Sequence, residues 1–241
     1  MDRREFLTAG GGLLLAGAAG TYAVGLLTQA GASEAAPAGG RRWGMVVDLR
    51  KCRPDCTACL EACRLENNTA SVGDARWDVH WIRKVHVKPK NGGAERSVVL
   101  LCNHCDHPPC AQVCPVQATY KRADGIVIVD HHRCIGCRYC MIACPYNARY
   151  FNFKESEEWP NKEFPKRSHG VAESCTLCAH LLDIGKKPAC VQACERVQAG
   201  ALVVGDLNDP QSEISRLVAE NSVKRLREDL GTEPKVYYIG L

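Results

Sequence analysis

The stretch Cys134-Ile-Gly-Cys137-Arg-Tyr-Cys140-Met-Ile-Ala-Cys144-Pro145 decides the fold of this 241-residue chain, because it crowds four thiols into one short loop. Thiolates are soft ligands that suit iron–sulfur clusters and zinc. Aromatic residues make up only 6% of the chain, so metal centres are expected to replace part of a hydrophobic core. All sixteen cysteines fall into four such quartets, which are Cys52/Cys56/Cys59/Cys63, Cys102/Cys105/Cys110/Cys114, Cys134/Cys137/Cys140/Cys144 and Cys175/Cys178/Cys190/Cys194.

The third quartet has the spacing C-x2-C-x2-C-x3-C-P of bacterial ferredoxins. In two-cluster ferredoxins, the first three thiolates of this run hold one [4Fe–4S] cluster and the fourth holds the neighbouring cluster. Four quartets therefore predict four [4Fe–4S] clusters in two crossed pairs. The predicted ligand sets are set A (Cys52, Cys56, Cys59, Cys194), set B (Cys63, Cys175, Cys178, Cys190), set C (Cys102, Cys105, Cys110, Cys144) and set D (Cys114, Cys134, Cys137, Cys140).

Zinc is the alternative metal, but four-cysteine zinc sites usually consist of two separated pairs. His104 and His107 lie inside the second quartet and resemble Rieske-type ligands. Since that quartet already has four cysteines, hydrogen bonding to a cluster is the favoured role. The first and fourth quartets end in Arg64 and Glu195 where the others have proline. An altered cluster in sets A or B stays open.

The N-terminus resembles a twin-arginine export signal, with Arg3-Arg4 before the uncharged stretch 8–32. Cleavage is expected after Ala32 or Ala38, and a retained membrane anchor is the alternative. Clusters that need reduced thiolates would have to cross the membrane inside a folded protein, which a disulfide-rich secreted protein would not require. The mature chain is therefore expected in the periplasm.

Alternating and apolar stretches predict short strands and helices. The expected strands are 46–49, 77–88 (broken at 82–83), 97–101, 126–129, 200–206 and 235–239, with a turn at 91–93 and a helix at 211–220 capped by Asp209-Pro210. The fold class is α+β, with two ferredoxin-like dicluster units in a pseudo-two-fold cluster arrangement. The expected division is a signal at 1–32, a linker at 33–42, an outer unit made of 43–100 and 154–241, and an inserted unit at 101–153.

Other features indicate neither an active site nor a nucleic-acid partner. The net charge is +4, and the basic residues are dispersed. No nucleophile–base pair, phosphate loop or dinucleotide motif is apparent, so the chain is not expected to be an enzyme by itself. Several side chains near the quartets are expected to be surface charges, capping residues or core aromatics, namely Arg133, Arg138, Lys186, Lys187, His131, His132, Trp77, Trp81 and Trp159.

Four motifs resemble the four-cluster iron–sulfur subunits of quinone-linked membrane oxidoreductases. They are Trp43-Gly-Met-Val-Val-Asp48, Cys102-Asn-His-Cys-Asp-His-Pro-Pro-Cys110, the third quartet through Tyr146, and Gly205-Asp-Leu-Asn-Asp-Pro210. Within that family the chain is most similar to the periplasmic iron–sulfur subunit of the dissimilatory sulfite-reductase-associated complex. That narrower resemblance depends on the twin arginines, Cys175-Thr-Leu-Cys178 and the tail from Gly231 to Ile239.

The resemblance implies an electron relay with defined neighbours. The expected partners are an integral membrane quinol-binding subunit and a periplasmic multihaem cytochrome c. Similar tails occur in polysulfide, tetrathionate and nitrite reductase subunits, so a molybdopterin catalytic subunit is the alternative partner. A free-standing ferredoxin-like carrier is the more distant alternative.

Overall fold

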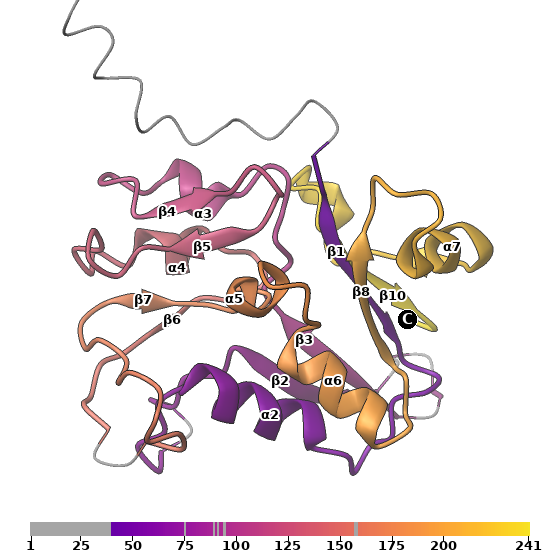
Figure 1. Ribbon diagram of the computed structural model, residues 1–241, viewed down its shortest axis with the longest axis horizontal. Helices are drawn as coiled ribbons and strands as arrows, with labels where there is room; N and C mark the ends of the chain where they lie inside the picture. The colour runs from indigo at the N-terminus through magenta and orange to yellow at the C-terminus, as the bar shows by residue number, and fades with distance from the viewer. Residues whose placement is uncertain (1–39, 75, 89, 91, 94, 157–158) are drawn as a thin grey trace, which may run out of the picture. The chain divides into compact units, whose positions relative to one another are not determined.

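The computed structural model describes residues 40–241 except 75, 89, 91, 94 and 157–158. The expected signal and most of the expected linker lie outside the described residues. The described residues form one compact unit, shown in Figure 1. It is a mixed α/β fold with small sheets and short helices.

A four-stranded sheet joins the two ends of the described chain, in the order β8-β1-β10-β9. Strand β1 pairs antiparallel with β8 and parallel with β10, and Met45 lies opposite Val236. Because β1 is covered on both faces, Met45, Val46 and Val47 are fully buried. The strands are β1 (Trp43–Asp48), β8 (Leu202–Asp206), β9 (Val223–Lys224) and β10 (Val236–Ile239).

Helix α7 (Glu213–Glu220) packs against β8 and β1, as Figure 1 shows, and buries Ile214 completely. The predicted cap of this helix was wrong. Ser212 is the cap, because its hydroxyl accepts a hydrogen bond from Ser215 N at 3.2 Å. Asp209 instead accepts from Gln211 N in the preceding turn.

The remaining strands of the described chain form two-stranded antiparallel sheets. They are β2 (Ile82–Val87) with β3 (Arg96–Leu101), β4 (Thr119–Lys121) with β5 (Val127–Val129), and β6 (Tyr150–Phe151) with β7 (Ala172–Glu173). The remaining helices are α2 (Ala58–Asn67), α3 (Pro109–Gln112), α4 (Tyr139–Ala143), α5 (Ala179–Leu182), α6 (Ala189–Arg196) and the 3-10 turn η1 (Glu228–Leu230).

The predicted strand over 77–88 is only half formed. Residues 77–81 are not a strand, because Trp77 N and Asp78 N both donate to Asp74 O in a turn. The strand begins at Ile82, where the sequence pattern predicted a break. Trp81 is 4% exposed and belongs to the main hydrophobic core, so its alternation with polar neighbours reflects packing in a loop. Of the other predicted strands, β1 begins three residues earlier than predicted, and the rest are confirmed within about two residues.

The main core runs through both expected units, from Met45 in β1 to Tyr238 in β10. Cysteines of the first, second and fourth quartets lie within it. Across the described part of the chain, none of the helices has the length and apolarity needed to span a bilayer.

Candidate iron–sulfur cluster sites

Helices α2 and α6 lie side by side and bring the first and fourth quartets together, as Figure 1 shows. Cys59 and Cys63 are four residues apart on α2, and Cys190 and Cys194 are four apart on α6. Residues at this spacing share one face of a helix. A thiol on α2 and a thiol on α6 can therefore face one site, although about 130 residues separate them in the sequence.

Set A surrounds a small cavity. All four of its cysteines line this cavity, and Cys194 comes from a different quartet than the other three. Cys194 Sγ accepts a hydrogen bond from Ala201 N at 3.2 Å. Lys84 also lines the cavity and donates to the carbonyl of Arg53 at 2.9 Å, which holds an ammonium beside these thiols.

The amide side chain of Asn67 links two thiols of set B. Asn67 Nδ2 lies 3.6 Å from Cys63 Sγ and 3.6 Å from Cys178 Sγ. Burial, with repulsion from Cys175 and Cys178, raises the pKa of Cys63 well above its usual value. The four thiols of this set are all buried. The crossed combination of one thiol from α2 with three from the fourth quartet is therefore present in space.

Set C surrounds a second small cavity. Cys102, Cys105, Cys110 and Cys144 all line it, so the last thiol of the third quartet joins three of the second. Asn103 and Arg149 line the same cavity. His104 has a φ of 43°, a left-handed conformation that turns the loop between the first two thiols.

The cysteines of set D lie in the loop before α4, in α4 itself and just after α3, and these two helices pack together. Burial, with repulsion from Cys110, Cys134 and Cys137, outweighs the attraction of Arg149 and raises the pKa of Cys140. Burial opposes ionisation of Cys114 as well, but backbone hydrogen bonds, the first from Thr119 at 3.4 Å, outweigh it and lower the pKa of Cys114.

Thiols are ligands for iron–sulfur clusters and for zinc. Among the described residues, no group of three Cys, His, Asp and Glu side chains is close enough to hold one metal ion. All sixteen cysteines are free of disulfides. Burial raises the pKa of Cys59 to about 11 and that of Cys102 to about 12, so these sulfurs need the charge of a metal to be thiolates at neutral pH.

Buried hydrogen-bond donors without a partner around set C also fit an iron–sulfur cluster. Asn103 Nδ2 and Arg149 Nε are buried and have no hydrogen-bond partner among the described residues. Both side chains line the set C cavity. A buried donor without an acceptor is costly, and the sulfurs of a cluster are acceptors. The residues of set C therefore suit an anionic, sulfur-rich group that would transfer single electrons when bound.

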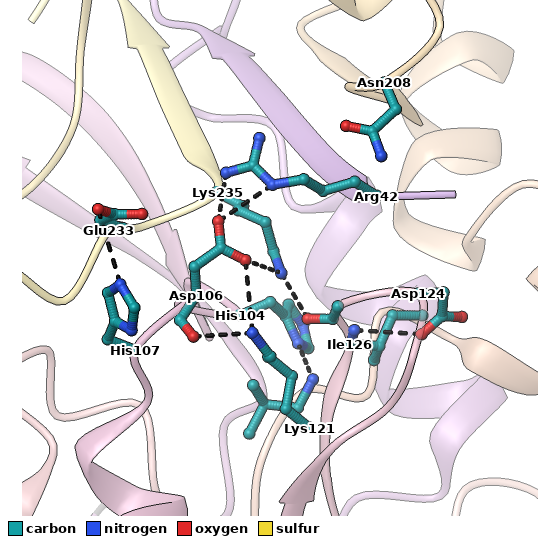
Figure 2. A network of polar contacts seen from close by, with 12 residues as sticks. Arg42, His104, Asp106, His107, Lys121, Asp124, Ile126, Asn208, Glu233 and Lys235 are labelled. Atoms are coloured by element: carbon teal, nitrogen blue, oxygen red, sulfur yellow. Dashed lines mark hydrogen bonds and ion pairs between the residues drawn. The ribbon is translucent and has the colours of Figure 1, made fainter. Parts of the chain in front are cut away.

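The segment before β10 contacts the set C loop, and Figure 2 shows Glu233 beside His107 and Lys235 beside Asp106. Asp106 N donates to Glu233 O at 3.0 Å, and Lys235 N donates to Asn103 O at 2.9 Å. The ammonium of Lys235 is fully buried and lies 3.2 Å from Asp106 Oδ1, and it also donates to Gly125 O. Arg42 pairs with the same carboxylate, so three segments meet at Asp106.

His104 is a neutral donor behind this network. Its Nδ1 accepts a hydrogen bond from Val127 N at 3.1 Å, which leaves the proton on Nε2. Burial, with the charges of Lys235 and Arg149, lowers the pKa of His104 to about 3. Nε2 has no partner among the described residues. His107, in contrast, is exposed and lies 3.7 Å from Glu233.

The other residues singled out in the sequence lie mostly at the surface. Arg133, His132, Lys186 and Lys187 are exposed. Arg138 is also exposed, and its guanidinium lies 5.6 Å from the Phe151 ring and 5.5 Å from the Phe153 ring.

Sequence reasoning missed three charged residues of the interior: Arg149 and Lys235 are buried, and Arg167 is half-buried. Arg167 lies 4.3 Å from the Trp81 ring and 3.8 Å from the buried carboxylate of Glu173. Arg149 follows Cys144 by five residues, and a basic residue so near a quartet was the one available signal. Nothing in the local sequence distinguishes Lys235 or Arg167 from surface charges.

Four groups of thiols on small sheets and short helices define the class of a ferredoxin-type iron–sulfur protein. Residues 97–206 match the 4Fe-4S dicluster domain family. The chain is 43% identical, over its full length and 98% of the relative, to the Hdr-like menaquinol oxidoreductase iron-sulfur subunit 1 of Archaeoglobus fulgidus. It is 41% identical to a tetrathionate reductase subunit of Salmonella typhimurium, over 83% of this chain and 73% of that one.

A third relative is the menaquinone reductase iron-sulfur cluster-binding subunit of Nitratidesulfovibrio vulgaris, which is 38% identical over 82% of this chain and 88% of its own length. The chain belongs to the family of iron–sulfur electron-transfer subunits of quinone-linked oxidoreductases. Its sixteen cysteines are the number that four [4Fe–4S] clusters require.

Proposed function

We propose that the chain relays single electrons through four [4Fe–4S] clusters held by sets A to D. The observation that carries the proposal is the convergence of thiols from distant quartets. The cavities of sets A and C each combine three thiols of one quartet with the last thiol of another. That combination is the crossed ligation of two-cluster ferredoxins.

The neighbour relations of the thiols support a serial order A–B–C–D. Cys59 of set A and Cys63 of set B share one face of α2. Burial, with repulsion from Cys178 and from Cys102 of set C, raises the pKa of Cys175 in set B. In the same way Cys110 of set C packs against Cys140 of set D. Sets A and B would then form the outer dicluster unit, and sets C and D the inserted one.

Exposure supports sets A and D as the two ends of the relay. Set B is wholly buried, and set C has one half-buried sulfur, that of Cys144. Sets A and D contain the remaining half-buried sulfurs, which are Cys52, Cys56, Cys114, Cys134 and Cys137. Electrons would be exchanged with partner subunits at these ends and passed between buried sets inside.

The proposed setting is the periplasmic face of a membrane complex. The twin arginines at positions 3 and 4 support export of the folded, cluster-loaded chain. The proposed partners are an integral membrane quinol-binding subunit and a periplasmic multihaem cytochrome c of a sulfite-reductase-associated complex. The full-length similarity to a subunit of a menaquinol oxidoreductase supports this choice.

A second candidate is the electron-transfer subunit of a molybdopterin oxidoreductase. The similarity to a subunit of tetrathionate reductase favours it. The role of the chain as a relay is the same in both candidates, and the difference lies in the redox centre at one end.

Purification of the tagged chain from native membranes tests the proposal. We expect about sixteen non-haem irons per chain, a membrane subunit and c-type haem in the same fraction. Molybdenum and a large catalytic subunit would favour the second candidate. Fewer than about fifteen irons after full reconstitution would contradict the four-cluster assignment, and a soluble monomer without partners would contradict the membrane complex.

A further inference from the structure

Arg149 is a buried guanidinium that is surrounded by cysteine side chains. The residue is 4% exposed. Burial alone opposes its charge, but attraction to Cys110, Cys102, Cys140 and Cys144 raises the pKa of Arg149. Three of these cysteines belong to set C and one to set D. The groups that most stabilise this charge are therefore sulfurs.

The contacts of Arg149 aim the guanidinium at set C. Its Nη2 donates to Cys110 Sγ at 3.2 Å, and its Nη1 donates to Thr119 Oγ1 at 3.4 Å. The side chain lines the set C cavity, and its Nε has no partner among the described residues. A hydrogen bond from a charged donor to a thiolate is stronger than one between neutral groups.

We infer that Arg149 raises the reduction potential of the cluster at set C, because its positive charge is the counter-ion of the thiolates that hold this cluster. This inference rests on the proposed function, because it requires a cluster held by set C. Hydrogen bonds to the sulfurs and the net charge around a cluster set its potential. Uptake of one electron adds one negative charge, which a fixed positive charge in a buried site stabilises.

The electron would arrive without a proton from Arg149. A guanidinium stays protonated throughout the physiological range, and the thiolates raise its pKa further. One electron passes from a neighbouring set to set C, no bond is made or broken, and the charge of Arg149 is unchanged. The contribution of Arg149 to the potential is therefore independent of pH between about 6 and 9.

The basic residues beside the other buried sets are placed differently. Burial lowers the pKa of Arg167, and the attraction that opposes this effect comes first from Glu173, 3.8 Å away, and only then from Cys63 of set B. Lys84 beside set A is half-buried and hydrogen-bonded to backbone carbonyls. A charge exposed to water or paired with a carboxylate has less effect on a nearby redox group. Arg149 is neither.

The experiment is an EPR-monitored redox titration of the reconstituted full chain with Arg149→Met, Arg149→Lys or Arg122→Met. Arg122 is the matched control, because it pairs with Asp124 at 3.0 Å and Asp183 at 2.6 Å. In Arg149→Met we expect the equilibrium constant for reduction of one cluster to fall at least about tenfold, which is about 59 mV for a one-electron couple. Arg149→Lys keeps the charge and should recover at least half of this shift. Arg122→Met should leave all potentials unchanged.

Two results would overturn the inference. One is an unchanged set of potentials in Arg149→Met, and the other is an equal shift in the Met and Lys variants, which would assign the effect to packing. If the Met variant does not load iron, the Lys variant decides, because a tenfold fall despite the retained charge contradicts a counter-ion role. Iron content of the wild-type chain separately tests the proposed function, so failure of the two ideas is distinguishable.

Discussion

Gly136 is a single residue on which the set D loop depends. It lies between Cys134 and Cys137 and has a φ of +70°, a conformation that residues with a side chain rarely adopt. A Cβ atom at this position would lie 2.5 Å from the carbonyl oxygen of Gly170. The set D loop can therefore bring three thiols to one site only because residue 136 has no side chain.

Gly136→Ala and Gly170→Ala form a matched pair. Gly170 has a φ of +76°, but a Cβ there would meet nothing within 4 Å. Both changes should cost about 1 kcal/mol for the left-handed conformation. Only Gly136→Ala should also push the loop away from a backbone carbonyl and lower iron content by about four per chain. Iron analysis after identical reconstitution measures this, and equal iron content in the two variants would contradict the account.

At the scale of elements, the C-terminal segment ties the sheet to the set C loop. Strand β10 lies between β1 and β9, and the residues just before it bond to the backbone of Asn103, Asp106 and His107. The buried ammonium of Lys235 completes this contact (Figure 2). The last residues of the chain are therefore part of the core of the fold.

Lys235→Met and Lys121→Met compare a buried and a half-exposed ammonium in one network. Lys121 lies 3.9 Å from the carboxylate of Asp106, at the rim of the same network. Loss of the buried cation should cost about 3 kcal/mol, because it leaves Asp106 and the Gly125 carbonyl without their buried partner. Loss of the rim cation should cost less than about 1 kcal/mol. The denaturant concentration that halves the cluster absorbance under anaerobic conditions reports both. A Lys235→Met midpoint at or above that of Lys121→Met would be inconsistent with a structural ammonium.

The sequence predicted elements well where the signal is local. Strand β3 and the hairpin strand β5 appear where they were predicted, and β10 lies within the predicted strand 235–239. The start of β2 was misplaced because a turn at Asp74 takes the backbone of Trp77 out of the strand. The cap of α7 was misplaced because Asp209 and Ser212 are both good caps and only the observed turn decides between them.

At the scale of the whole molecule, the candidate sites combine local and long-range information. The grouping of the thiols into quartets is written in the sequence, because three ligands of one cluster come from a single loop. The roles of Arg149 and Lys235 could not be predicted from the sequence, because each side chain contacts its loop only after the chain has folded. A charged residue looks the same in the sequence whether it ends in water or beside a thiolate.

The crossed arrangement of the ligands is the central claim, and paired serine variants test it most directly. Two substitutions in one set should remove the same cluster, whereas two in different sets should remove two clusters. We compare Cys105→Ser/Cys144→Ser, which both fall in set C, with Cys140→Ser/Cys144→Ser, which fall in sets D and C. The last two cysteines belong to the same quartet of the sequence, so an uncrossed arrangement makes the opposite prediction.

The measurement is iron per chain after anaerobic reconstitution, with the wild-type chain and each single variant alongside. The account predicts about sixteen irons in the wild type, about twelve in each single variant and in Cys105→Ser/Cys144→Ser, and about eight in Cys140→Ser/Cys144→Ser. About eight irons in Cys105→Ser/Cys144→Ser together with about twelve in Cys140→Ser/Cys144→Ser would contradict it.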